Sequence, residues 1–178
     1  MGGIAMAGIQ ANLIVTYDPA HTATAKKELV AVLSILKKKP VFVKFKAEGV
    51  LAVKVVKPKE TVKEIAKLCR KKPAMFRETF HYVPVDCWAK SEIKEMQKCV
   101  KGLVKGIGQK EKWKMELNKR SYEKHNSLEL IRCLTDVIDR PNVDLDKPQK
   151  IVRVEIFGKI AAISLVSKDE IAEIPALK

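Results

Sequence analysis

The spacing of apolar residues switches repeatedly between two periods along residues 12–85, and this switching restricts the possible folds more than any other feature of the chain. A period of two, or a short continuous apolar run, is typical of a strand, and a period near 3.6 is typical of an amphipathic helix. Strand patterns cover residues 12–17, 41–45, 51–55 and 79–85. Helix patterns cover residues 25–36 and 58–72. Strands and helices therefore alternate in this half of the chain.

The predicted order in this half is strand, helix, strand, strand, helix, strand. Glu48 and Gly49 supply the turn between the two adjacent strands, and Pro73 ends the second helix. This order is that of the ferredoxin-like motif, in which two helices cover one face of a four-stranded antiparallel sheet. We therefore predict a ferredoxin-like unit at residues 12–86, whose other sheet face is available to a partner.

The second half of the chain predicts another mixed unit, at residues 87–167. Helix patterns cover residues 93–107 and 127–138, and strand patterns cover residues 112–119, 151–157 and 159–166. Asn126 or Ser127 can cap the second of these helices. The predicted fold class is therefore α+β, with two α/β two-layer units packed together and a boundary near Asp86 and Cys87.

The charge balance of the chain favours a polyanionic partner. The chain carries 35 Lys and Arg against 21 Asp and Glu, a formal charge of +14 at pH 7, and such an excess suits nucleic acid or an anionic membrane surface. A membrane surface would require a basic amphipathic helix with large apolar groups opposite its lysines, and none stands out in this sequence. A lysine-rich surface that only maintains solubility is the plainer alternative. Nucleic acid is the predicted partner.

The sequence shows no membrane or export signal. No apolar stretch approaches the roughly 20 residues that cross a bilayer, and residues 1–10 lack the basic and apolar regions of a signal peptide. We therefore expect a cytoplasmic protein without membrane association.

No pattern in the chain indicates catalysis or metal binding. The cysteines form no C-x-x-C pair, so we expect free thiols rather than a zinc site or a disulfide scaffold; they are Cys69, Cys87, Cys99 and Cys133. The histidines, at positions 21, 81 and 125, are isolated from one another. The stretch 102–108 contains glycines and a lysine, but it ends a helix and lacks the spacing of a phosphate loop. We expect no catalytic residue, no metal and no cofactor.

Several segments carry a resemblance to a known domain family. Residues 143–149 (VDLDKPQ), 152–156 (VRVEI) and 162–166 (AISLV) resemble the C-terminal signature of THUMP domains. The upstream strand that ends in Asn118, Lys119 and Arg120 fits as well, and Arg77 with the following VPV at 83–85 resembles the junction between a ferredoxin-like unit and a THUMP domain. The resemblance covers residues 12–166. It implies a THUMP domain at 87–167.

Among THUMP proteins, the chain most resembles the stand-alone members of archaea and eukaryotes that assist formation of N4-acetylcytidine in tRNA. That resemblance implies a non-catalytic adaptor whose partners are tRNA and a separate tRNA acetyltransferase. Because the sequence ends shortly after the last expected strand, we expect no nucleotide-binding, methyl-transfer or deaminase domain. Two alternatives stay open: a THUMP subunit that serves another modification, such as thiolation or methylation, and a small enzyme that acts on phosphorylated metabolites.

The basic residues differ in what their positions imply. The clusters at 37–39 and 70–72 close predicted helices, where positive charge offsets the helix dipole. Lys119 and Arg120 instead end a strand and lead into a polar loop at a helix start, where backbone N–H groups favour phosphate. By the resemblance, Lys119 and Arg120, and also Arg77, grip the acceptor end of tRNA.

Further residues are expected beside this RNA-binding site. Lys124, Asn126 and Lys159 are predicted neighbours of Lys119 and Arg120. Tyr122 has two alternative roles, since its ring can stack on an unpaired base or pack at the base of the loop. Because the base edges of an A-form stem are hard to reach, recognition would rest on phosphates, 2′-hydroxyls and the unpaired 3′ end.

Overall fold

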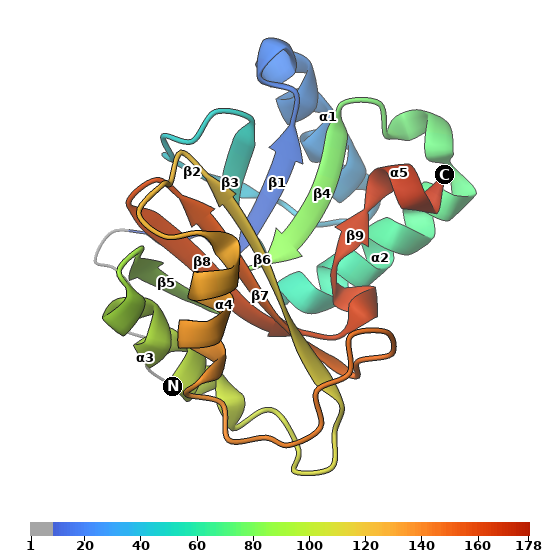
Figure 1. The fold of residues 1–178 in the computed structure, drawn as a ribbon. Helices are drawn as coiled ribbons and strands as arrows, with labels where there is room; N and C mark the ends of the chain where they lie inside the picture. Colours follow the sequence, from blue (N-terminus) through green and yellow to red (C-terminus); the bar gives the residue numbers. More distant parts are fainter. Residues whose placement is uncertain (1–8) are drawn as a thin grey trace. The chain divides into compact units, whose positions relative to one another are not determined.

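The computed structural model describes residues 9–178, which form two compact units. The first unit comprises Gln10–Val85 and Asp169–Lys178, and the second comprises Asp86–Lys168. Each unit has its own sheet with helices packed on it (Figure 1). The predicted α+β class is therefore confirmed. The C-terminal segment returns to the first unit, which the sequence patterns did not predict.

The sheet of the first unit has five strands in the order β2-β3-β1-β4-β9. The strands are β1 (Leu13–Tyr17), β2 (Val41–Val43), β3 (Val50–Lys54), β4 (Thr79–Pro84) and β9 (Ala172–Glu173). All neighbouring pairs are antiparallel. The first four strands have the ferredoxin-like order that the apolar spacing predicts. The short β9 extends this sheet by pairing with His81 and Tyr82 of β4.

Two long helices cover one face of this first sheet. They are α1 (Thr22–Ile35) and α2 (Pro58–Lys71). Leu29 and Leu33 of α1 and Ile65 of α2 are fully buried against inward-facing residues of β1 and β3. Pro58 lies in the first turn of α2, where its missing N–H removes a donor that would have no partner in the helix. The short α5 (Ile174–Leu177) packs against α2.

The sheet of the second unit has four strands in the order β5-β8-β7-β6. The strands are β5 (Cys87–Lys90), β6 (Trp113–Arg120), β7 (Lys150–Phe157) and β8 (Ile160–Val166). The pair β6–β7 is parallel and the other pairs are antiparallel. Helix α3 (Ile93–Val104) packs against β5 and β8, and helix α4 (Ser127–Thr135) packs against β6, so one core forms on one face of the sheet.

Three elements of the second unit differ from the prediction. Helix α3 ends at Val104 rather than at residue 107. Strand β5 lies where only a boundary segment was expected. The strand was not predicted because just Cys87 and Ala89 of it join the core, and so short an alternation carries no periodic signal. Helix α4 ends at Thr135 rather than at residue 138. The hydroxyl of Thr135 donates to the carbonyl of Ile131 at 2.7 Å, which offers the backbone an alternative to continued helix.

A disulfide joins Cys87 of β5 to Cys99 of α3, so the expectation of free thiols is wrong for this pair. The inward face of α3 carries Cys99, and β5 brings Cys87 next to it, with the two Cα atoms 6.0 Å apart. Apolar spacing can place each cysteine in a core, but it cannot show which strand a helix packs on. Cys69 and Cys133 are free, as expected.

Candidate functional site

The carboxyl-terminal ends of β5, β6 and β7 meet at one edge of the second unit. Lys90 of β5 pairs with Ile160 at the start of β8, and Arg120 of β6 pairs with Phe157 of β7. The turn between β7 and β8 lies at the same edge. We call this region the basic end and define it by five side chains: Lys90, Lys119, Arg120, Lys124 and Lys159.

Backbone hydrogen bonds hold the strand ends of the basic end together. The N–H of Gly158 donates to the carbonyl of Arg120 at 2.9 Å, and the N–H of Ser91 donates to the carbonyl of Lys159 at 2.9 Å. The hydroxyl of Ser91 adds a hydrogen bond to the carbonyl of Gly158 at 2.7 Å. Gly158 has φ 59°, a conformation that favours glycine, and it permits the tight turn that carries Lys159. The cations are therefore attached to a fixed backbone.

The predicted pair Lys119 and Arg120 divides between the two faces of the sheet, because consecutive side chains of a strand alternate. Lys119 is half-buried, and its Nζ donates to the carbonyl of His125 at 3.0 Å, which fastens the loop that follows β6. Arg120 is exposed. Arg120, Lys124 and Lys159 form no ion pair with any residue in the described part of the chain. Lys119 thus positions the loop. Arg120, Lys124 and Lys159, like the exposed Lys90, are available to an anion.

The loop of the basic end runs into the amino terminus of α4. The side-chain oxygen of Asn126 accepts a hydrogen bond from the N–H of Glu129 at 2.8 Å, so Asn126, rather than Ser127, caps the helix. Nδ1 of His125 lies 3.1 Å from a carboxylate oxygen of Glu129. The helix start adds a positive partial charge to the basic end.

Tyr122 packs into the core of the second unit, which decides between its two alternative roles. Its side chain is only 8% exposed and belongs to the cluster that includes Leu130. Burial raises the pKa of its hydroxyl. That hydroxyl has no hydrogen-bond partner among the described residues. The ring faces are therefore not available to stack on a base.

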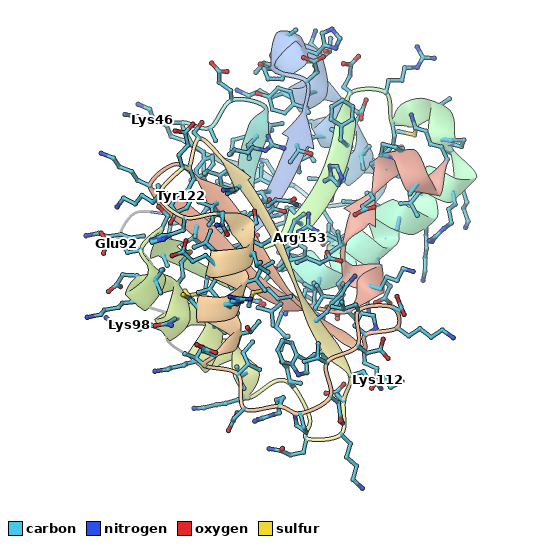
Figure 2. The ribbon with its side chains drawn as sticks, in the orientation of Figure 1. Lys46, Glu92, Lys98, Lys112, Tyr122 and Arg153 are labelled. Atoms are coloured by element: carbon cyan, nitrogen blue, oxygen red, sulfur yellow. A yellow bond between two sulfur atoms is a disulfide. The ribbon has the colours of Figure 1, made fainter. Side chains whose placement is uncertain are left out.

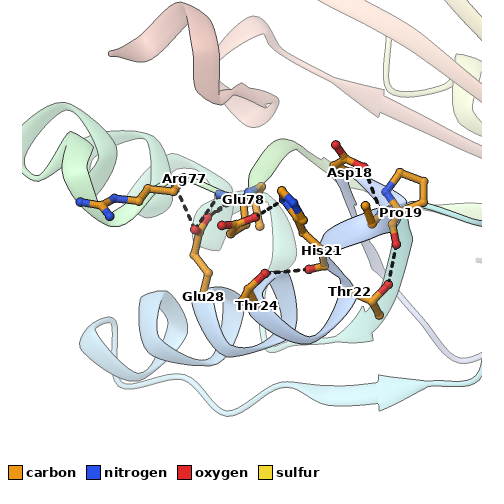
Figure 3. Close-up of polar contacts among 10 residues, drawn as sticks. Asp18, Pro19, His21, Thr22, Thr24, Glu28, Arg77 and Glu78 are labelled. Atoms are coloured by element: carbon orange, nitrogen blue, oxygen red, sulfur yellow. Dashed lines mark hydrogen bonds and ion pairs between the residues drawn. The ribbon is translucent and has the colours of Figure 1, made fainter.

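Arg77 lies in the first unit, just before β4, on a backbone that Glu28 of α1 holds in place. The N–H groups of Arg77, Glu78 and Thr79 donate to the Glu28 carboxylate at 2.8, 2.8 and 3.0 Å, and the hydroxyl of Thr79 donates to it at 2.6 Å (Figure 3). The side chain of Arg77 is exposed. Sequence patterns did not reveal the role of Glu28, because a single polar residue among the polar positions of an amphipathic helix carries no distinguishing signal, although Glu28 is half-buried in the fold.

A row of paired charges crosses the sheet face of the second unit opposite α3 and α4. Arg153, labelled in Figure 2, is buried. Its Nε donates to Glu155 at 2.7 Å and its Nη1 to Glu116 at 2.6 Å, while Lys114 pairs with Glu116 at 2.8 Å. Burial acts to raise the pKa of Glu116, but the hydrogen bonds from Lys114 and Arg153 outweigh it and lower that pKa. These groups neutralise one another, which suits a structural role better than acid–base chemistry.

Residues 9–178 contain neither a metal-binding cluster nor a membrane-spanning helix. No three His, Cys, Asp or Glu side chains lie together in a way that could hold a metal ion. None of the helices in that range combines the length and apolar character that spanning a bilayer requires.

Residues 90–166 match the THUMP domain family. The second unit therefore contains a THUMP domain, and this part of the sequence resemblance is confirmed. No curated protein matches the chain in a sequence comparison.

Several solved structures share the fold at low sequence identity. PH1313 from Pyrococcus horikoshii Ot3 has a TM-score of 0.59 at 16% identity, over 89% of this chain and 55% of that protein. TrmN from Thermus thermophilus has a TM-score of 0.54 at 16% identity, over 86% of this chain and 44% of that one. A 4-thiouridine synthetase, solved with RNA and ATP, has a TM-score of 0.53 at 13% identity, over 92% of this chain and 42% of that one. The chain thus spans about half of the length of these proteins, and the likeness concerns the fold.

Proposed function

We propose that this protein is a non-catalytic RNA-binding adaptor that holds tRNA, by its acceptor end, for a separate acetyltransferase that forms N4-acetylcytidine. The observation that carries the proposal is the basic end of the THUMP domain. Exposed cations on a fixed backbone and the start of a helix occur there together. The resemblance of the chain to adaptors of tRNA acetylation supports the choice of reaction.

The basic end suits recognition by shape rather than by base sequence. Arg120, Lys124 and Lys159 are exposed and unpaired among the described residues, so they can contact phosphates without first breaking an ion pair. Lys119 would act indirectly, because its bond to His125 holds the loop in position. Contacts of this kind release counterions from RNA, so the logarithm of the binding constant should fall linearly with the logarithm of the salt concentration.

The adaptor would leave the chemistry to its partner. Fixing the acceptor end sets the distance to a cytidine elsewhere in the tRNA, so the adaptor raises the effective concentration of that cytidine at the acetyltransferase and orients it. The non-catalytic role, the acetyltransferase partner and the cytoplasmic localisation stay predictions.

A role in another tRNA modification is the second candidate. It is favoured by the fold likeness to a 4-thiouridine synthetase that was solved with RNA. In that case the same basic end would serve a thiolating or methylating partner. Mass spectrometry of tRNA nucleosides from cells that lack this protein separates the two candidates.

Loss of N4-acetylcytidine alone supports the adaptor for acetylation, and loss of a thiolated or methylated nucleoside supports the second candidate. An unchanged nucleoside profile would overturn both. The purified protein, given acetyl-coenzyme A, ATP and unmodified tRNA, is expected to bind the tRNA but to form no acetylcytidine. Turnover by the protein alone would contradict the non-catalytic role.

A further inference from the structure

The first unit has a cavity of its own beside the β2–β3 hairpin. The cavity has a volume of about 320 Å³, near the lower end of the range for small-ligand sites. Residues of β1, α1, β2 and β3 surround it, and the hairpin that forms one side lies at the edge of the five-stranded sheet (Figure 1). The lining includes Tyr17, Thr22, Lys26, Phe42 and Lys44.

One part of the cavity offers an aromatic surface. Phe42 pairs with Val53 in the register of the hairpin, so its ring extends from the apolar face of the sheet. Because β2 is an edge strand, the core does not enclose this ring, and Phe42 remains 40% exposed. Because Lys26 lies over the ring, a planar ligand would stack on the exposed part of Phe42 that Lys26 does not cover.

The other part of the cavity is cationic. Nζ of Lys26 lies over the Phe42 ring, 5.7 Å from its centre, in a cation–π contact, and Lys44, which follows the last residue of β2, also lines the cavity. Neither lysine forms an ion pair with a residue in the described part of the chain. The lining includes no Asp or Glu. The cavity therefore favours a ligand that carries negative charge beside a planar group.

The cavity is formed before any ligand arrives, because the hairpin is fixed to β1. The N–H of Tyr17 donates to the carbonyl of Gly49 at 2.9 Å, and the Tyr17 hydroxyl lies 3.2 Å from the hydroxyl of Thr22 on α1. Gly49 has φ 69°, and a Cβ at this position would come within 2.7 Å of the Tyr17 carbonyl oxygen. Only glycine allows this close approach, so the turn holds one wall of the cavity in place.

We propose that this cavity binds a single nucleotide, with the base against Phe42 and the phosphate beside Lys26 and Lys44. A nucleotide combines a planar group with a negative charge at the separation that one small cavity can accommodate. The nucleotide can come from an unpaired segment of an RNA chain or from a free mononucleotide. The first source rests on the proposed RNA-binding function, and the second does not.

The test uses the whole protein labelled with ¹⁵N and three probes: inorganic phosphate, cytidine monophosphate and an unstructured six-nucleotide uridine oligomer. We expect amide shifts at residues 17–26 and 41–52 with the nucleotide probes, and much weaker shifts there with phosphate. Saturation by the oligomer with a far weaker response to the monophosphate assigns the cavity to RNA, and comparable saturation by both assigns it to nucleotides in general. Absence of shifts in these residues with both nucleotide probes overturns the inference.

Matched variants separate stacking and charge from simple damage to the fold. Phe42→Leu keeps an apolar side chain but removes the aromatic face, and we expect it to weaken nucleotide binding at least fivefold. We expect a loss of the same size from Lys26→Gln, which removes a positive charge. Val41→Ala, on the opposite face of β2, and Lys27→Gln, which lies outside the cavity, are the controls. Equal weakening by a variant and its control would contradict the proposal.

The same variants distinguish failure of this inference from failure of the proposed function. If Phe42→Leu and Lys26→Gln bind intact tRNA and the oligomer as tightly as the parent protein does, the cavity is not a nucleotide site. The adaptor function would still stand in that case. Saturable binding of the monophosphate by a protein that binds no tRNA supports the cavity and overturns the adaptor function.

Discussion

The two units carry similar excesses of positive charge but arrange it differently. The first unit has 17 Lys and Arg against 9 Asp and Glu, and the second has 18 against 12. In the first unit several lysines are paired: Lys38 with Glu64, Lys57 with Glu60, and Lys63 with Asp169 and Glu170. The second unit also has paired cations, namely Lys98, Lys112, Lys114, Arg140 and Arg153. Its exposed cations Arg120, Lys124 and Lys159 gather at the strand ends instead and form no ion pair among the described residues. Net charge therefore indicates a polyanionic partner, and only the arrangement locates the contact.

The units also differ in what stabilises them, and this difference leads to the largest predicted effect. Only the second unit contains a disulfide among the described residues. The bonded cysteines are 12 positions apart, and closing a loop of that size stabilises a protein by about 3 kcal/mol. Reduction should therefore speed hydrogen exchange in peptides of the second unit, measured by mass spectrometry, and leave the first unit unchanged.

Cys69→Ala, which removes a buried free thiol from the first unit, is the control for the reduction experiment. Reduction should act on this variant as it acts on the parent protein. If reduction speeds hydrogen exchange equally in both units, the disulfide does not stabilise the second unit selectively.

The first unit relies instead on Glu28. Changing Glu28→Ala leaves three backbone N–H groups and the Thr79 hydroxyl without their acceptor, and we expect a loss of about 2 kcal/mol in the free energy of unfolding of the first unit. Urea unfolding followed by hydrogen exchange measures it. Glu64→Ala, which loses only the half-buried ion pair with Lys38, should cost less than about 1 kcal/mol. If Glu28→Ala is as stable as Glu64→Ala, the first unit does not depend on Glu28 and the prediction is wrong.

The basic end gives the next largest effect, on tRNA affinity. Changing Arg120 and Lys159 together to Ala should weaken binding of intact tRNA roughly tenfold and lower the salt slope by about 0.7–0.9 for each phosphate contact that is lost. The double change of Lys38 and Lys39 to Ala in the first unit is the control, because Lys38 is already paired with Glu64. Filter binding over a range of salt concentrations compares them. Equal losses from the two double variants would mean that binding follows net charge alone.

The smallest predicted effect concerns acid stability of the second unit. The folded pKa of Glu116 is lowered, so this carboxylate contributes stability above its unfolded pKa, near its usual value of 4.5, and loses it as the pH falls through the folded pKa. In Glu116→Gln, stability of the second unit should fall less steeply below about pH 4.5. Urea midpoints measured at intervals from pH 7 to pH 3 test this. A parallel pH dependence in the two proteins would show that Glu116 does not carry the effect.

Long elements were predictable because each repeats its apolar spacing often enough to be read. Helices α1, α2 and α3 and strands β6, β7 and β8 have the type and approximate position that the spacing predicts. The short strands β5 and β9 were not predictable, since they join their sheets through pairing with β8 and β4 rather than through a pattern of their own.

The candidate site was predictable only in part. The position of Lys119 and Arg120 at a strand end follows from the sequence, as does the helix start after them. Their separation onto opposite faces follows from strand alternation, but the hydrogen bond from Lys119 to His125 depends on how the loop folds back. Tyr122 illustrates the limit, because its residue type suits both stacking and packing, and only the position of α4 places it in the core.

Four properties could be predicted from the residues alone: the α+β class, the ferredoxin-like order of the first half, the THUMP domain and the excess of positive charge. These properties are set by local spacing, short motifs and composition. The tertiary structure alone decided which cysteines are bonded, which lysines are paired, and that Glu28 holds the start of β4. It also decided that Phe42 and Lys26 meet at one cavity. Each of these depends on segments far apart in the chain packing together, and residue spacing carries no information about such contacts.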